Sequence, residues 1–126
     1  PVASKNDSFK DFVLDQLDGF RGVTCHAMFG GYGLYRSEVF FGIIHKGRLY
    51  FKTNEVTQPA YASRGMLPFR PNGKQILKHY YEVPVDILED AEQLMLWARS
   101  AFTPPSAQLA LPFLDILSSR DLLAQA

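Results

Sequence analysis

The sequence predicts an α+β domain in which an antiparallel β-meander has helices packed on it. Two observations lead to this class. Short apolar segments with two-residue breaks fill residues 23–53, and helical patterns flank them on both sides. Connections this short join antiparallel strands, because parallel neighbours need a long crossover. We expect one helix, three or four strands, a second helix, one or two strands and a final helix.

The first helix is expected to begin at Ser8, whose hydroxyl caps free backbone amides. Gly19 is expected to end it in the left-handed conformation. Its apolar side chains recur near a 3.6-residue period, which places them in one stripe. The stripe consists of Phe9, Phe12, Val13, Leu17 and Phe20.

The meander follows, and its strands are expected over residues 23–29, 32–36, 39–45 and 48–53. The breaks between them suit tight hairpins and fall at Gly30-Gly31, Ser37-Glu38 and Lys46-Gly47. The stretch MFGGYGLY, residues 28–35, matches neither phosphate-loop pattern, and no helix follows it. We therefore interpret Gly30 and Gly31 as a chain corner, where positive φ is free for glycine.

Two-residue turns would set the register of this meander. The expected cross-strand pairs are Gly33 with Gly42, Gly42 with Phe51, Tyr35 with Phe40, and Ile44 with Leu49. Two glycines side by side would leave a trough on one face, which is a candidate for a small-ligand site.

The opposite face is expected to combine apolar residues with cations. Its apolar members would be Tyr32, Leu34, Phe41, Ile43 and Tyr50. Such a face is too apolar to remain in water, so a partner subunit is its simplest cover. Rings among cations also resemble platforms for single-stranded nucleic acid. The candidate partner or nucleic-acid residues are Arg36, Phe41, His45, Lys46, Arg48, Tyr50 and Lys52.

The second half of the chain predicts two more helices and one strand. A helix over residues 55–64 would be capped by Thr53 or Asn54 and stopped by Gly65. Residues 76–83 form the expected strand, and the final helix begins at Asp86 or Asp90 and ends near residue 102. A loop is expected before that strand, marked by Pro68, Pro71 and Gly73.

Size and composition favour one folded domain. Of 126 residues, 47% are hydrophobic and 21% are charged, which suits a core that needs no disulfide or metal. We place the domain at residues 1–103, and residues 104–126 form a tail with room for a short helix. The apolar runs are too short to span a membrane, and neither a secretory signal nor a second cysteine is present. We therefore expect a cytoplasmic protein with no membrane partner.

The net charge is zero, but its distribution is uneven. Residues 21–79 contain nine basic and two acidic residues, whereas residues 1–20 and 80–126 are acidic. The basic middle would either attract a polyanion or lie against the acidic flanks, within one chain or across a dimer.

The sequence contains no pattern typical of a catalytic or metal site. The spacing of His26, His45, His79 and Cys25 matches no zinc motif, and adjacent Cys25 and His26 would point to opposite faces of a strand. We expect a protein that is not an enzyme and that holds no cofactor.

Several ordered blocks resemble the N-terminal domain of the TfoX/Sxy family and together cover about residues 9–102. They are MFGGYGLY, FFGIIHKGRLYFKT, YASRGMLPF, YYEVPVDILED and LWARSA. The resemblance implies a secretion-chaperone-like α+β fold without known catalytic residues. It also implies a role in regulating competence genes, in which full-length members act as coactivators beside the cyclic-AMP receptor protein.

Full-length members of that family add a C-terminal helical domain, for which residues 104–126 are too few. We therefore expect a non-enzymatic regulatory module with a protein partner in the transcription machinery, close to DNA, with direct DNA binding left open. The alternative is a chaperone-like or scaffolding homodimer without a DNA role.

Overall fold

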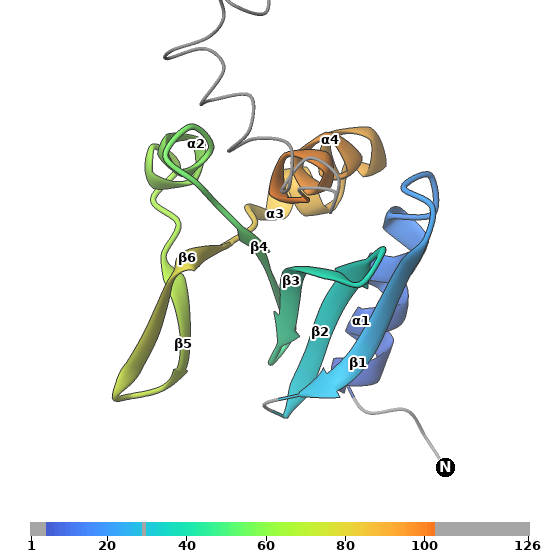
Figure 1. Cartoon of the computed structure of the whole chain (residues 1–126), viewed down its shortest axis with the longest axis horizontal. Coiled ribbons are helices and arrows are strands. Elements are labelled where there is room, and N and C mark those ends of the chain that lie inside the picture. Colours follow the sequence, from blue (N-terminus) through green and yellow to red (C-terminus); the bar gives the residue numbers. More distant parts are fainter. Residues whose placement is uncertain (1–4, 29, 103–126) are drawn as a thin grey trace, which may run out of the picture.

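The computed structural model describes residues 5–28 and 30–102, which form a two-layer α+β fold (Figure 1). Its helices are α1 (Lys5–Gln16), α2 (Gln58–Ala62), α3 (Val85–Leu88) and α4 (Ala91–Ala101). Its strands are β1 (Val23–Met28), β2 (Gly31–Arg36), β3 (Val39–His45), β4 (Arg48–Lys52), β5 (Pro68–Asn72) and β6 (Gln75–Glu82). The predicted fold class is confirmed.

Within the described residues, all strands belong to one antiparallel sheet in the order β1-β2-β3-β4-β6-β5. Helices α1 and α4 pack on one side of β3, and the sheet turns its other side to the viewer in Figure 1. We call this second side the helix-free face. No helix in the described part of the chain is long and apolar enough to cross a membrane.

Helix α1 differs from the prediction at both of its ends. It begins at Lys5, so the exposed Ser8 lies inside the helix and is not its cap. No glycine or proline interrupts this segment, and an exposed serine costs a helix little. The left-handed residue is Gly22, with φ 90°, and the expectation for Gly19 is wrong. Gly19 instead permits close packing, since a Cβ there would lie 3.0 Å from Met95 Sδ.

The four strands of the meander and their hairpins are confirmed. Ser37 and Glu38 have φ values of 50° and 65°, and Lys46 and Gly47 have 51° and 73°. Two successive positive φ angles give the turn whose twist matches that of the flanking strands. At the corner between β1 and β2, Gly30 has a φ of 76°, whereas Gly31, the other glycine expected there, is the first residue of β2.

The register between β2 and β3 departs from the expected one at a β-bulge. Tyr35 pairs with Phe40 as predicted, but Leu34 then lies opposite Gly42. The predicted pairing of Gly33 with Gly42 is therefore wrong. A bulge sets two residues of one strand against one residue of its partner, which a count of turn residues does not reveal.

This one-residue insertion divides the predicted apolar face between the two sides of the sheet. Leu34 and Phe41 lie in the core under the helices, whereas Ile43 and Tyr50 lie on the helix-free face. Tyr32 packs against the core under the helices as well. Beyond the bulge, the predicted pairs Gly42 with Phe51 and Ile44 with Leu49 are confirmed.

The segment expected as a proline-marked loop is the edge strand β5. It pairs only with β6, and its register shifts on both sides of Phe69. Proline lacks the backbone N–H that would pair with a neighbouring strand, and a central strand has such a neighbour on each of its two edges. An edge strand with interrupted pairing accommodates Pro68 and Pro71.

The remaining helices are shorter than predicted because their capping residues are placed differently. Asn54 Oδ1 accepts hydrogen bonds from the amides of Val56 and Thr57 at 2.8 and 2.9 Å in a turn that precedes α2. The N-cap of α2 is Thr57, so the prediction of Thr53 or Asn54 as its cap is wrong. Where one final helix was predicted, the structure has two, α3 and α4. Asp90 starts the second of them, α4, and its side chain accepts a 3.1 Å bond from the amide of Gln93.

The main core lies between the helices and the sheet. Val13 of α1, Leu17 just after α1 and Leu94 of α4 are at most 1% exposed, and they belong to the same buried cluster as the strand side chains Phe41 and Phe51. Phe12 of the predicted stripe is 40% exposed, so the stripe is narrower than predicted. The tail predicted over residues 104–126 lies outside the described residues.

Candidate functional site

The residues predicted to form one partner or nucleic-acid face do not share a surface. Phe41 is fully buried in the main core. Tyr50 and His45 are each 9% exposed. Both pack on the ring of Phe69 from β5, with ring centroids 4.7 and 5.2 Å apart respectively. The β5–β6 hairpin thus covers part of the face that was expected to need a partner.

The cations of the predicted face are also separated. Arg48 forms two 3.0 Å hydrogen bonds to the carboxylate of Glu82. Arg36 lies over rings of the main core, as described below. Lys46 is exposed in the turn after β3, and exposed Lys52 lines a groove with Lys78. These side chains do not form one basic surface.

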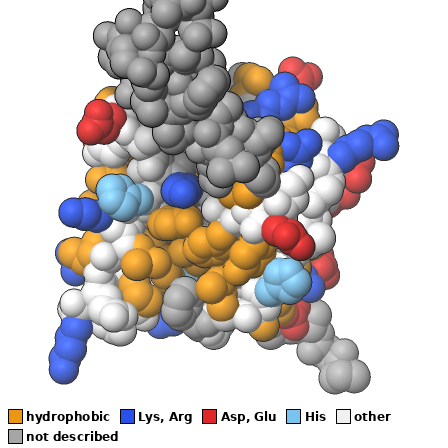
Figure 2. Space-filling view, in the orientation of Figure 1, with side chains coloured by type: hydrophobic (Ala, Val, Ile, Leu, Met, Phe, Trp, Pro, Cys, Tyr) orange, Lys and Arg blue, Asp and Glu red, His pale blue; other side chains and the backbone are white. Residues whose placement is uncertain are grey.

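A different set of side chains crosses the helix-free face. His26 of β1, Tyr35 of β2, Phe40 of β3 and Tyr80 of β6 form an aromatic row. Successive ring centroids are 5.1, 5.2 and 5.3 Å apart. His26 is exposed and the other three rings are partly buried, and Figure 2 shows a band of hydrophobic side chains across this face.

Gly33 lies beneath this aromatic row, and its lack of a side chain leaves room for the rings of Tyr35 and Phe40. A Cβ at Gly33 would lie 3.0 Å from Phe40 and 3.2 Å from Tyr35, and it would overlap the sulfur of Met28. At Gly42, the corresponding space is filled by side chains of the main core. The predicted trough between the two glycines is therefore absent from the described part of the sheet.

Burial raises the pKa of two phenols of this face, Tyr80 and Tyr50. It raises the pKa of Tyr80 to about 12, and the nearby Tyr35 adds to the shift. The pKa of Tyr50 is also raised, first by burial and then by the carboxylate of Glu82. Both phenols stay protonated near pH 7, so this face presents uncharged rings and weak hydrogen-bond donors.

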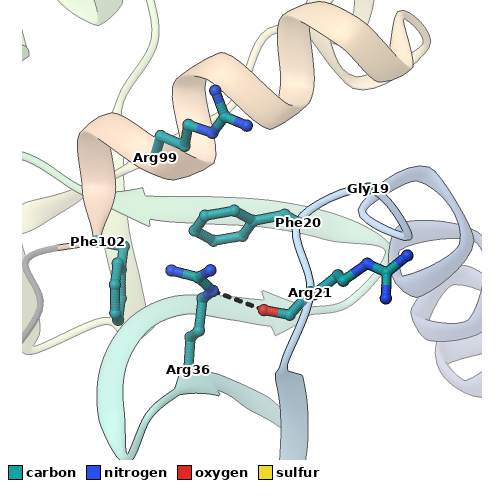
Figure 3. Close-up of a pocket in the computed structure, with 6 residues that line it drawn as sticks. All are labelled: Gly19, Phe20, Arg21, Arg36, Arg99 and Phe102. Carbon is teal, nitrogen blue, oxygen red and sulfur yellow. Dashed lines mark hydrogen bonds between the residues drawn. The ribbon is translucent and has the colours of Figure 1, made fainter.

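A second feature lies on the helix side, where the chain leaves α1 and where α4 ends. Gly19, Phe20, Arg21, Arg36, Arg99 and Phe102 line an open pocket of about 450 Å³, which we call the arginine pocket (Figure 3). The guanidinium carbon of Arg36 is 4.2 Å from the ring centroid of Phe20 and 4.8 Å from that of Phe102. Arg36 Nε also donates a 2.6 Å hydrogen bond to the backbone carbonyl of Arg21.

These two rings and one carbonyl fix the position of the Arg36 guanidinium. Phe20 and Phe102 are 3% and 8% exposed, so the rings that hold it are themselves held by the core. In Figure 3, the side chain of Arg99 lies on the far side of the Phe20 ring, and that of Arg21 points away from Arg36.

The histidines and the cysteine do not assemble into a ligand set. Cys25 and His26 lie on β1, His45 ends β3 and His79 lies on β6. Among the described residues, no three His, Cys, Asp or Glu side chains are grouped closely enough to hold a metal ion.

A family model described as the TfoX N-terminal domain matches residues 15–103. The chain belongs to the TfoX N-terminal domain family. No curated protein matches the sequence. The match includes all strands of the sheet and α2 to α4, so the aromatic row and the arginine pocket both lie within the TfoX N-terminal domain.

Sequence reasoning missed both features of this TfoX N-terminal domain. Arg21 lies between α1 and β1, Arg36 ends β2 and Arg99 lies on α4, and no local motif connects them. Tyr80 reaches the aromatic row because β6 pairs with β4, a contact between distant parts of the chain. The basic middle of the sequence was a signal for the first two arginines, but it did not include Arg99.

Proposed function

We propose that this TfoX N-terminal domain is a non-enzymatic regulatory module that acts by protein–protein contact, in competence-type transcriptional coactivation near DNA. The family match over residues 15–103 carries this proposal. No catalytic residue is assigned to the domain, and its role is to bind a component of the transcription machinery.

The aromatic row supplies the contact surface in this proposal. Rings that are partly exposed and fixed by their neighbours lose little side-chain entropy on binding, which is why aromatic residues dominate interface hot spots. Tyr35, Phe40 and Tyr80 are partly buried and contact one another in series. Their neutral rings suit a protein surface better than a polyanion, whose binding requires cations.

Replacing Tyr35 and Phe40 together by serine is expected to abolish regulation while the domain remains folded. Transcripts would be compared in the source organism between a deletion strain and strains complemented with the wild type or the variant. The wild type should restore the transcripts that the deletion changes. The double variant should not, since losing two hot-spot rings costs binding about 2 kcal/mol or more.

Val56→Ser is the matched control, because Val56 is 85% exposed and lies just before α2, outside the aromatic row. It should restore transcription as the wild type does. A deletion that changes no transcripts would contradict the regulatory role. Full restoration by the double variant, with circular dichroism showing folded protein, would contradict the assigned surface.

The apolar band of the helix-free face also favours a second candidate, a scaffolding homodimer. A second copy of the chain would cover the aromatic row, as exposed apolar patches commonly require. Sedimentation at about 50 μM, well above the Kd of a tight dimer, should then give a dimer for the wild type and a monomer for the double serine variant. A wild-type monomer at that concentration would exclude this candidate.

A further inference from the structure

We propose that the arginine pocket binds one phosphomonoester group, the dianionic phosphate at the end of a ligand or on a side chain of a partner. This site is distinct from the aromatic row, which lies on the other side of the sheet. The inference goes beyond the regulatory function and does not depend on it.

The first argument is an imbalance of charge. Three arginines, Arg21, Arg36 and Arg99, are among the residues that line the pocket. In the described part of the chain, side-chain ion pairs within 4.0 Å join Lys10 with Asp11, Arg48 with Glu82 and Arg64 with Asp86. The pocket arginines take part in none of these pairs. An anion of two negative charges would offset most of their repulsion.

The second argument is the fixed orientation of Arg36. Rings lie against its guanidinium, and its Nε proton is already donated to the Arg21 carbonyl. The Nη groups remain as donors on a plane whose direction is set before any ligand arrives. A guanidinium fixed in this way suits the bidentate recognition of phosphate, and binding then costs little ordering of the side chain.

The third argument is the position of the other two cations. Arg21 and Arg99 are exposed, and their side chains extend away from Arg36 on two sides of the pocket in Figure 3. Arginine side chains at a surface rotate readily, so a bound anion would attract both toward its free oxygens.

The chemistry of the pocket selects the type of anion. Both phenylalanines are nearly buried and already pack against Arg36, so they offer no free face on which a nucleobase could stack. Asp18 and Glu38 lie close in sequence to the pocket residues and interrupt any continuous basic track for DNA. A single carboxylate would leave more of the positive charge uncompensated than a phosphate dianion would.

Titration of the full ¹⁵N-labelled chain with inorganic phosphate tests this inference. At constant ionic strength, the Nε–Hε signal of Arg36 and the amide signals of Phe20 and Arg21 should shift and saturate with a Kd of about 1 mM or below. The double variant Arg21→Gln, Arg99→Gln should bind phosphate at least tenfold more weakly. Both side chains are exposed, so this variant is expected to fold.

Arg70→Gln is the matched control, since Arg70 is an exposed arginine on β5 outside the pocket. It should leave the Kd for phosphate unchanged. No saturable shift beyond that caused by chloride, or an equal loss of binding in the control and the double variant, would overturn the inference. Shifts spread over all surface arginines would overturn it as well.

Two further probes identify the source of the phosphate group. A short peptide with one phosphoserine and free glycerol phosphate would be titrated against the same signals. Tighter binding of the peptide supports a phosphorylated partner, and equal binding supports a small metabolite. Either result would support the phosphate site. The site would be contradicted if a 20-base-pair DNA duplex displaced inorganic phosphate more strongly than both probes, compared at equal concentration of phosphate groups. Transcriptional regulation is not measured here, so this test and that of the proposed function fail independently.

Discussion

Gly31→Ala is expected to destabilise the domain by about 3 kcal/mol or more, close to the whole stability of a small domain. A Cβ at Gly31 would overlap the backbone carbonyl oxygen of Ile44 and lie 3.1 Å from the Cα of His45. Both atoms belong to β3, next to β2, so no side chain can rotate away to make room. The two strands would have to separate at the corner of the sheet.

Urea unfolding followed by circular dichroism would measure this loss. Gly73→Ala is the matched control, because no atom lies within 4 Å of a Cβ built there and Gly73 has no positive φ. It should change the free energy of unfolding by less than about 0.5 kcal/mol. A Gly31→Ala variant as stable as the control would show that the β2–β3 contact is looser than described.

Phe41→Ala is expected to cost about 3 to 5 kcal/mol, as is usual for a buried phenylalanine. Phe41 is fully buried, and its ring centroid lies 5.8, 5.9 and 6.2 Å from those of Phe20, Phe51 and Phe102. Those rings come from both layers of the fold, so the cavity would open between the sheet and the helices. The same urea titration measures the effect.

Phe12→Ala makes the same chemical change on α1, where the side chain is 40% exposed. It should cost less than about 1.5 kcal/mol, because much of the side chain is already in water. Equal losses for the two variants would contradict the burial of Phe41. A loss near zero for Phe41→Ala would instead support the expectation that Phe41 lies on a contact face.

Gly31 belongs to the stretch MFGGYGLY, residues 28–35. The stretch combines three solutions to backbone and packing problems. Gly30 supplies a positive φ, Gly31 allows β3 to approach, and Gly33 makes room for Met28 and the rings of the aromatic row. Sequence reasoning identified the corner and excluded a phosphate loop, but it could not assign the separate reasons. Those reasons are contacts with β3 and with side chains elsewhere on the sheet.

Local patterns were sufficient for the elements that depend on neighbouring residues. The alternation of apolar residues and the two-residue turns predicted the meander. Asp90, which caps α4, was one of the two starts predicted for the final helix, with Asp86 the other. Local patterns were insufficient for β5, where two prolines indicated a loop. Pairing with β6 on one edge overrides that local signal.

The strands of the meander and their hairpin turns were available from the linear chain, because each depends on residues close together in it. The TfoX family was available from several blocks in their order along the chain. The assignment of side chains to faces was not, since a single bulge at Leu34 and Tyr35 exchanged the faces of the following residues. The cover that Phe69 places over Tyr50 and the meeting of Arg21, Arg36 and Arg99 at one pocket likewise arise from contacts between distant segments. Such contacts are set by packing between layers, a free energy that no local pattern in the sequence encodes.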